Sequence, residues 1–162
     1  MGFFGNIDAT MSISTDATPD PTVPEPANAD LTQAEFEALT WTPVPNMVSG
    51  PDTGGSTSFV ERQVWDERFN SAFKGSVSGN EGTIVLAVDD AAQADGRVAL
   101  GAASAAATNA YALKFEWPTG RVEYGRFLIG EPTLTKGAKE DPPEETFATK
   151  VVQLPVIDDG VA

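Results

Sequence analysis

The chain has 162 residues and a formal net charge of −14, with 24 Asp and Glu against 10 Lys and Arg. This balance argues against binding to nucleic acid or to an anionic membrane surface, because there is no excess of basic residues to neutralise phosphates. The sequence contains neither cysteine nor histidine. Disulfides, zinc–thiolate sites, serine–histidine triads and imidazole acid–base catalysis are therefore excluded, and only paired carboxylates remain as hydrolytic groups.

The composition of residues 1–30 changes from apolar to proline-rich along the segment. Met1 to Ile13 contains enough apolar residues for a short strand or arm. The following stretch TDATPDPTVPEPANAD carries four prolines, including Pro24, and little that a core could bury. Proline removes a backbone donor and favours extended backbone. We therefore predict an extended N-terminal arm over residues 1–30, which is either a flexible tail or a segment that orders against a neighbouring subunit.

The stretch LTQAEFEALTWTPVP predicts a short helix. Thr32 is the expected N-cap, and Glu35 three residues later completes a capping-box pattern. Leu31, Phe36 and Leu39 would form the apolar side of this helix. It cannot extend beyond about residue 41, because prolines follow at 43 and 45.

The next segments predict mostly strands. Residues 50–58, GPDTGGSTS, are expected to form a loop, and residues 59–69 a strand rich in β-branched and aromatic residues. Residues 71–78 are a second strand or a loop, and GNEG at 79–82 is expected to be a turn. Residues 83–88, TIVLAV, are apolar on both faces, as expected of a central strand.

Residues 90–107 form the best helix candidate because they are rich in alanine, the strongest helix former. Asp89 or Asp90 is the expected N-cap. Val98 and Leu100 are expected to add apolar contacts. The glycines at 96 and 101 weaken the helix by about 1 kcal/mol each, so packing must hold it. A small-residue face would let this helix lie close to a sheet.

The stretch AYALKFEWPTGRVEYGRFLIG, residues 110–130, predicts a hairpin. Apolar residues alternate with smaller or charged ones in its first half, and residues 118–120 provide a tight reversal. Gly125 marks an expected bulge. A charged, proline-containing loop follows, and residues 146–157 predict a final strand closed by Pro155. Together these elements predict an α+β fold, an antiparallel β-sandwich or barrel with one main helix packed on a side.

Acidic and aromatic clusters are the remaining candidates for chemistry. Asp89, Asp90 and Asp95 lack the spacing of a calcium-binding loop, and helix capping accounts for them better. The carboxylates at 140, 141, 144 and 145 are expected to lie in a solvated loop. The aromatic residues Trp65, Tyr111, Trp117 and Tyr124 fit either a carbohydrate-stacking platform or, better, a core and subunit contacts. We predict no catalytic residue, no cofactor and no metal site.

The order of elements from Gly82 to Ile157 resembles the major tail tube proteins of long-tailed, non-contractile phages. That pattern is a strand, a helix entered through an acidic turn with Gln93, a hairpin, a charged loop and a final β-branched strand. The hairpin corresponds to Tyr111–Gly120 and Val122–Ile129, and the final strand to Phe147–Val156. LTQAEFEALTWTPVP and residues 73–79 resemble the front half of the family. The proline-rich stretch before Asp30 departs from its pattern.

The resemblance implies a structural virion protein with a tail-tube-like domain at 31–157, between the arm at 1–30 and a C-terminal tail at 158–162. Six copies would join their sheets into one inner barrel, and the resulting rings would stack into a tube with an acidic lumen. Genomic DNA would pass through without specific binding. A tape measure protein would lie inside, with tail tip and tail terminator proteins at the ends. The expected location is the virion tail, and the host cytoplasm during assembly.

The resemblance also implies which residues make contacts between subunits and rings. These are Pro24, Trp41, Met47, Phe59, Trp65 and Val156. An alternative is a β-sandwich binding module, either a virion decoration protein or a carbohydrate-binding domain, which would stay monomeric or trimeric. A third alternative is a carboxylate-dependent hydrolase, which a turnover assay would reveal.

Overall fold

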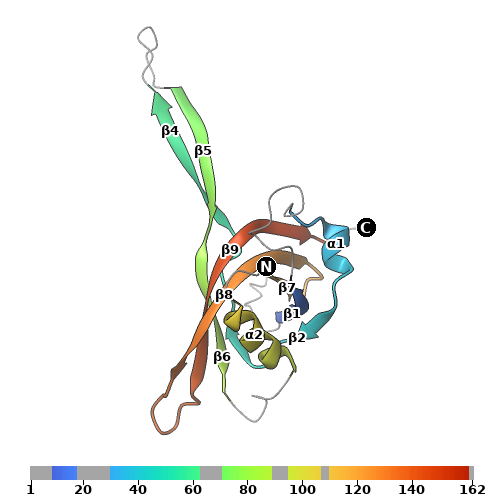
Figure 1. Cartoon of the computed structure of the whole chain (residues 1–162), viewed down its shortest axis with the longest axis vertical. Coiled ribbons are helices and arrows are strands. Elements are labelled where there is room, and N and C mark those ends of the chain that lie inside the picture. The colour runs from blue at the N-terminus through green and yellow to red at the C-terminus, as the bar shows by residue number, and fades with distance from the viewer. Residues whose placement is uncertain (1–8, 18–29, 63–70, 89–94, 107–109, 161–162) are drawn as a thin grey trace.

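The computed structural model describes residues 9–17, 30–62, 71–88, 95–106 and 110–160. Its secondary structure comprises β1 (Thr10–Ala17), α1 (Gln33–Glu37), β2 (Trp41–Pro43), β3 (Met47–Ser49), β4 (Gly55–Arg62), β5 (Ser71–Gly79), β6 (Glu81–Ala87), α2 (Asp95–Ala105), β7 (Tyr111–Glu116), β8 (Val122–Thr135) and β9 (Glu144–Asp158). Figure 1 shows a curved sheet with α2 packed on one side and α1 at another. The predicted α+β fold with an antiparallel sheet and one main helix is confirmed.

Seven strands form one antiparallel sheet in the order β2-β1-β7-β8-β9-β6-β3. Its two edge strands, β2 and β3, are neighbours in the chain, so the segment between them crosses from one edge of the sheet to the other. Along this crossing Val44 N–H donates to the Met11 carbonyl at 2.9 Å, and Ala87 N–H donates to the Asn46 carbonyl at 3.0 Å. The sheet is therefore strongly curved, but it is not a closed barrel.

The main core lies on one face of this sheet. Alternate residues of five strands point to that face, as the period of two for a strand requires. The fully buried members include Met11, Ile13, Ile84, Leu113, Phe127 and Phe147. Helix α2 adds Leu100 and Ala103, both fully buried, and packs against β1, β2 and β8. This burial is what holds the glycine-weakened helix in place, as the sequence predicts.

A second core lies on the opposite face, under α1. Phe36 is fully buried and stacks on Tyr124, with ring centroids 5.4 Å apart. The predicted capping box is confirmed, because Thr32 N–H donates to the Glu35 carboxylate at 2.7 Å. Leu31 and Leu39 pack against this cluster as expected. These contacts fix a helix of only five residues, which would not be stable alone in water.

Strand β1 lies within residues 1–30, where Met1 to Ile13 predict a short strand or arm and the prolines that follow predict an extended arm. It pairs with β2 on one side and β7 on the other, and Met11 and Ile13 are buried in the main core. The alternation of apolar and small polar residues from 10 to 14 is a strand pattern, but the prolines that follow dominate the composition. The rest of the predicted arm lies outside the described residues, and the division of the chain at residue 30 stays a prediction.

Several local predictions are wrong. Residues 55–58 belong to strand β4 rather than to a loop. Serine and threonine are common in turns, but here they pair with residues of β5. Strand β6 alternates in burial and lies next to the edge, so it is not buried on both faces. Strand β9 continues past Pro155 to Asp158, since the proline lies where the register with β8 shifts. Val98 is 51% exposed because it points away from the sheet.

The hairpin at residues 110–130 follows the prediction. Gly120 N–H donates to the Trp117 carbonyl at 2.9 Å, and Gly120 has a φ of 87°, so the turn needs glycine. The register between β8 and β9 shifts at Gly125, where a bulge is expected. Tyr111, Leu113 and Phe115 face the main core. Trp117 lies beyond the end of β7 rather than in it.

Helix α2 approaches the crossing segment at Gly96. A Cβ on this residue would lie 1.9 Å from the Pro43 carbonyl oxygen, which is backbone and cannot move aside. We expect Gly96→Ala to destabilise the protein by about 1–3 kcal/mol, as overpacking does. In the matched control Gly101→Ala, the new Cβ meets the flexible end of Arg97 at 3.1 Å.

The control should be neutral or stabilise by up to about 1 kcal/mol, because alanine is the better helix former. Urea unfolding of both variants measures the difference. Equal stabilities would show that α2 does not depend on this close contact.

Candidate assembly surfaces

Strands β4 and β5 form a two-stranded ribbon that extends away from the curved sheet (Figure 1). Four of its apolar side chains are exposed, namely Phe59 at 68%, Val60 at 57%, Phe73 at 57% and Val77 at 53%. Val60 and Phe73 lie directly opposite each other on one face, and Phe59, next to Val60, points to the other face. A two-stranded ribbon is marginally stable in water on its own. Apolar groups on both faces therefore mark it as a surface for a partner.

The base of this ribbon is fixed to the sheet through β9. Val151 N–H donates to the Asn80 carbonyl at 3.0 Å, where β5 passes into β6. A Cβ on Gly79 would lie 1.9 Å from the Val151 carbonyl oxygen. Only glycine allows the two backbones to cross this closely. The expected turn at residues 79–82 is thus a crossing point that sets the direction of the ribbon.

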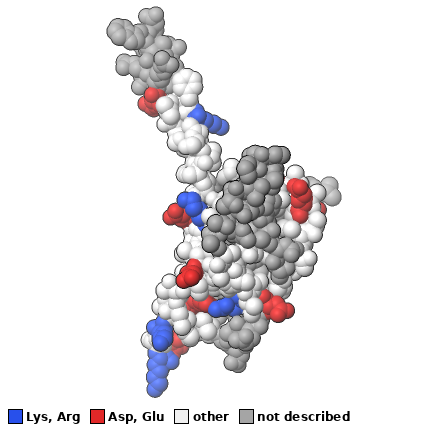
Figure 2. All heavy atoms as spheres, viewed as in Figure 1, with Lys and Arg blue, Asp and Glu red and all other residues white. Residues whose placement is uncertain are grey.

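A second extension is formed by the end of β8 and the loop that follows it, at the other end of the long axis (Figure 1). Residues 131–135 of β8 are exposed, and Leu134 is 54% exposed. The loop beyond them is solvated as predicted, and it carries Lys136 and Lys139. Figure 2 shows basic side chains gathered at this end of the molecule. This extension is therefore more polar than the β4–β5 ribbon.

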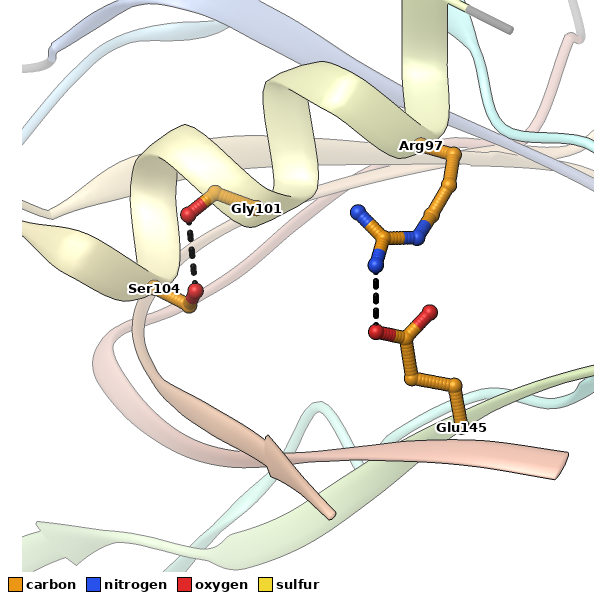
Figure 3. Close-up of polar contacts among 4 residues, drawn as sticks. All are labelled: Arg97, Gly101, Ser104 and Glu145. Carbon is orange, nitrogen blue, oxygen red and sulfur yellow. Dashed lines mark hydrogen bonds and ion pairs between the residues drawn. The ribbon is translucent and has the colours of Figure 1, made fainter. Parts of the chain in front are cut away.

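The ion pair between Arg97 and Glu145 joins α2 to β9 (Figure 3). Glu145 is only 7% exposed, so the prediction that it lies in a solvated loop is wrong. It belongs to β9 instead and points toward the helix. The Arg97 guanidinium also lies 5.8 Å from the centre of the Phe147 ring. On the helix itself, Ser104 Oγ donates to the Gly101 carbonyl at 2.7 Å (Figure 3).

Gln153 anchors the segment that enters α1. Its side-chain amide donates to the Leu31 carbonyl at 2.8 Å and accepts from Leu31 N–H at 3.0 Å. Gln153 is 5% exposed, and its oxygen lies 3.4 Å from Arg126 Nη1. Burial lowers the pKa of Arg126, against the opposing effect of Asp30. This cluster therefore sets where the chain from residue 30 meets the sheet.

The second core also changes the pKa of Tyr124. Burial raises the pKa of the Tyr124 hydroxyl, and nearby carboxylates add to the rise (Glu37, Asp158 and Glu116). Trp41, one of the predicted contact residues, packs beside this ring, and its Nε1–H donates to the Phe36 carbonyl at 3.1 Å. The Lys114 ammonium lies 5.4 Å from the Trp41 ring centre. Trp41 is thus engaged within its own chain.

The other predicted contact residues fall in different places. Phe59 is exposed on the ribbon, Met47 lies on the edge strand β3 against the main core, and Val156 packs against the second core. Pro24 and Trp65 lie outside the described residues. The structure does not bring the four described residues together on one surface. Their role in contacts between subunits stays a prediction.

Sequence reasoning missed several residues of these surfaces. Val60, Phe73 and Val77 were not singled out, although their spacing is compatible with alternating strands. Gln153 and Arg126 gave no signal, because a buried polar residue cannot be distinguished from an exposed one within an alternating strand. In the part of the chain that the structure describes, no group of three or more acidic side chains could hold a metal ion. No described helix has the length and apolar character to cross a membrane.

No family model and no curated protein sequence matches this chain. Solved structures do. The sheath/tube terminator of the extracellular contractile injection system PVC matches with a TM-score of 0.62 over 98% of this chain and 98% of that one, at 9% identity. The SPP1 tail tube matches with a TM-score of 0.52 over 97% of this chain and 79% of that one, at 13% identity. The fold is therefore that of tail tube and tube terminator proteins.

The Arg97–Glu145 pair is testable with a double-mutant cycle. We expect Arg97→Met alone to cost about 1–3 kcal/mol, because it leaves a buried carboxylate without its partner. Adding Glu145→Met should recover part of that loss, since the apolar pair buries no charge. Urea unfolding of the four proteins measures the coupling.

The control cycle uses the exposed pair of Lys150 and Glu81, 3.2 Å apart, where the coupling should stay below about 1 kcal/mol. Additive losses at Arg97 and Glu145 would contradict a joining role for this pair.

Because Gln153 bonds to the segment that enters α1, we expect its replacement to weaken α1 more than the rest of the sheet. Gln153→Leu leaves the N–H and carbonyl of Leu31 without their side-chain partner, so we expect a loss of about 1–3 kcal/mol. Hydrogen exchange in α1 should accelerate more than in β8. Gln33→Ala is the matched control, since Gln33 makes only an exposed helix contact to Glu37 at 2.8 Å. Uniformly faster exchange throughout the sheet would show that Gln153 supports the whole fold instead.

Proposed function

We propose that this protein is a structural subunit of a phage-type tail tube. Six copies form a ring by joining their sheets, and rings stack into the tube. The observation that supports this most directly is an apolar two-stranded ribbon, exposed on both faces, on the fold of tail tube and tube terminator proteins. A sheet with open edges acts as a template for pairing, and ring formation satisfies those edges.

The acidic composition supports a conduit for DNA. With a net charge of −14 per copy, the lumen of a ring repels phosphates, so genomic DNA passes during ejection without specific binding. The proposed partners are further copies of the chain, a tape measure protein inside, and tail tip and tail terminator proteins at the ends. The protein acts in the virion tail after assembly in the host cytoplasm. The proposed role is structural and needs no catalysis.

Among the predicted contact residues, Phe59 is best placed for this role because its side chain is exposed on the ribbon. Trp41 and Val156 first stabilise the second core of their own chain. Contacts by these two residues would therefore involve their outer surfaces only. The contribution of Pro24, Met47 and Trp65 belongs to the same proposal.

A second candidate is a tube terminator, which ends a tube rather than extending it. The observation that favours it is the similarity to the PVC sheath/tube terminator, which covers 98% of both chains, whereas 79% of the SPP1 chain is covered. A terminator needs the contact around the ring but only one of the two faces that stack. It therefore forms single rings that do not elongate.

One experiment separates these functions. We expect purified protein to form rings with a central channel as its concentration rises, visible by negative-stain electron microscopy and weighed by light scattering. Stacked tubes support the tube subunit, and single rings that never stack support the terminator. Monomers at every concentration would contradict both and favour the alternative of a monomeric binding module.

A further inference from the structure

Beyond its base, where β9 crosses at Gly79, the β4–β5 ribbon has two open outer edges in the described part of the chain. The two strands form a sheet of their own and pair with each other, over eight residues in β4 and nine in β5. Backbone groups of successive residues in a strand point to opposite sides. Each strand therefore directs about half of its N–H and carbonyl groups away from the ribbon.

One hydrogen bond at the base of the ribbon determines which residues direct their backbone N–H and carbonyl groups outward. Asn80 N–H donates to the Gly54 carbonyl at 3.0 Å, so even-numbered residues of β4 point toward β5. The register shift between Thr57 and Phe59 adds its extra residue to β5, so the alternation of β4 continues unbroken. The odd-numbered Thr57 and Phe59 then point outward. Lys74 lies opposite Phe59 in the register, and opposite residues of an antiparallel pair share the same orientation. The Lys74 N–H therefore points outward from β5.

These edges lack proline, one of the means by which proteins protect an edge against pairing. Neither GSTSFVER of β4 nor SAFKGSVSG of β5 contains a proline. The exposed end of β8 differs, because it carries Pro132. Proline removes the backbone donor that a pairing strand needs. The ribbon has one register shift, between Thr57 and Phe59, and charged residues at Glu61 and Lys74, but its backbone donors are intact and its apolar side chains are exposed.

We propose that the ribbon is the strand-pairing surface between copies of this chain, with the open β4 edge of one copy bonded to the open β5 edge of the next. This inference rests on the proposed function, since it names the contact that builds the ring. Pairing β4 with a second β4 would close at a dimer and leave both β5 edges open. Pairing β4 with β5 uses both edges of every copy and continues until a ring closes. It also brings exposed apolar side chains of neighbouring ribbons together.

Proline substitution at outward positions tests the pairing. Thr57→Pro and Lys74→Pro each remove one outward donor without removing a bond inside the ribbon. Thr57→Ala and Lys74→Ala keep the donor and serve as matched controls. We expect each proline variant to remain monomeric where the wild type and the alanine controls assemble, with mass measured by light scattering. The melting temperatures should match those of the controls, which shows that the curved sheet is intact.

Mixing the two proline variants distinguishes this pairing from others. Thr57→Pro keeps an intact β5 edge, and Lys74→Pro keeps an intact β4 edge. An equimolar mixture should therefore form dimers of twice the monomer mass and no rings. A mixture that stays monomeric while the wild type assembles would overturn the β4–β5 pairing.

A further variant leaves every backbone donor in place. Val60→Ser with Phe73→Ser removes two side chains that are each more than half exposed in the single copy. We expect assembly to weaken at least tenfold with little change in the melting temperature. Assembly of this variant and of the proline variants at wild-type concentrations would overturn the inference and leave the proposed function standing. Failure of the wild type itself to assemble would overturn both.

Discussion

The fold depends on how the curved sheet is closed without a complete ring of hydrogen bonds. Strands β2 and β3 are three residues each and belong to the same short segment, which crosses between the two ends of the sheet. Helix α2 packs against that crossing with Gly96 at the contact. The main core is therefore sealed by a helix and a crossing chain rather than by strand pairing. Strand β8 and the β4–β5 ribbon can then extend beyond this core.

That surplus length produces the surfaces available for assembly. Strand β8 has 14 residues, and its last five, residues 131–135, are exposed beyond the core. The β4–β5 ribbon extends from the opposite end and is anchored only at its base. The two extensions differ in proline, since the end of β8 carries Pro132 whereas neither strand of the ribbon contains one. A ribbon that keeps all its backbone donors is consistent with a partner in the assembled state.

Most of the elements could be predicted from the sequence where a local pattern determines them. The capping box at Thr32 and Glu35, the turn at Gly120 and the bulge at Gly125 each depend on residues close in the chain. The prediction failed where the outcome depends on distant partners. The burial of Glu145 follows from Arg97, 48 positions away. The pairing of β1 follows from β2 and β7, which no pattern within residues 10–17 identifies.

The same distinction applies to the assembly surfaces. The sequence predicts both Phe59 and Trp41 as contact residues, but only the structure separates an exposed ribbon residue from one that stabilises its own core. The family resemblance suggested sheets that join between subunits without saying which edge is used. The proposed pairing assigns that edge to β4 and β5, from the absence of proline in both strands and from the direction of the Asn80–Gly54 hydrogen bond. In the proposed assembly, copies of the chain recognise one another through backbone edges rather than through a side-chain motif.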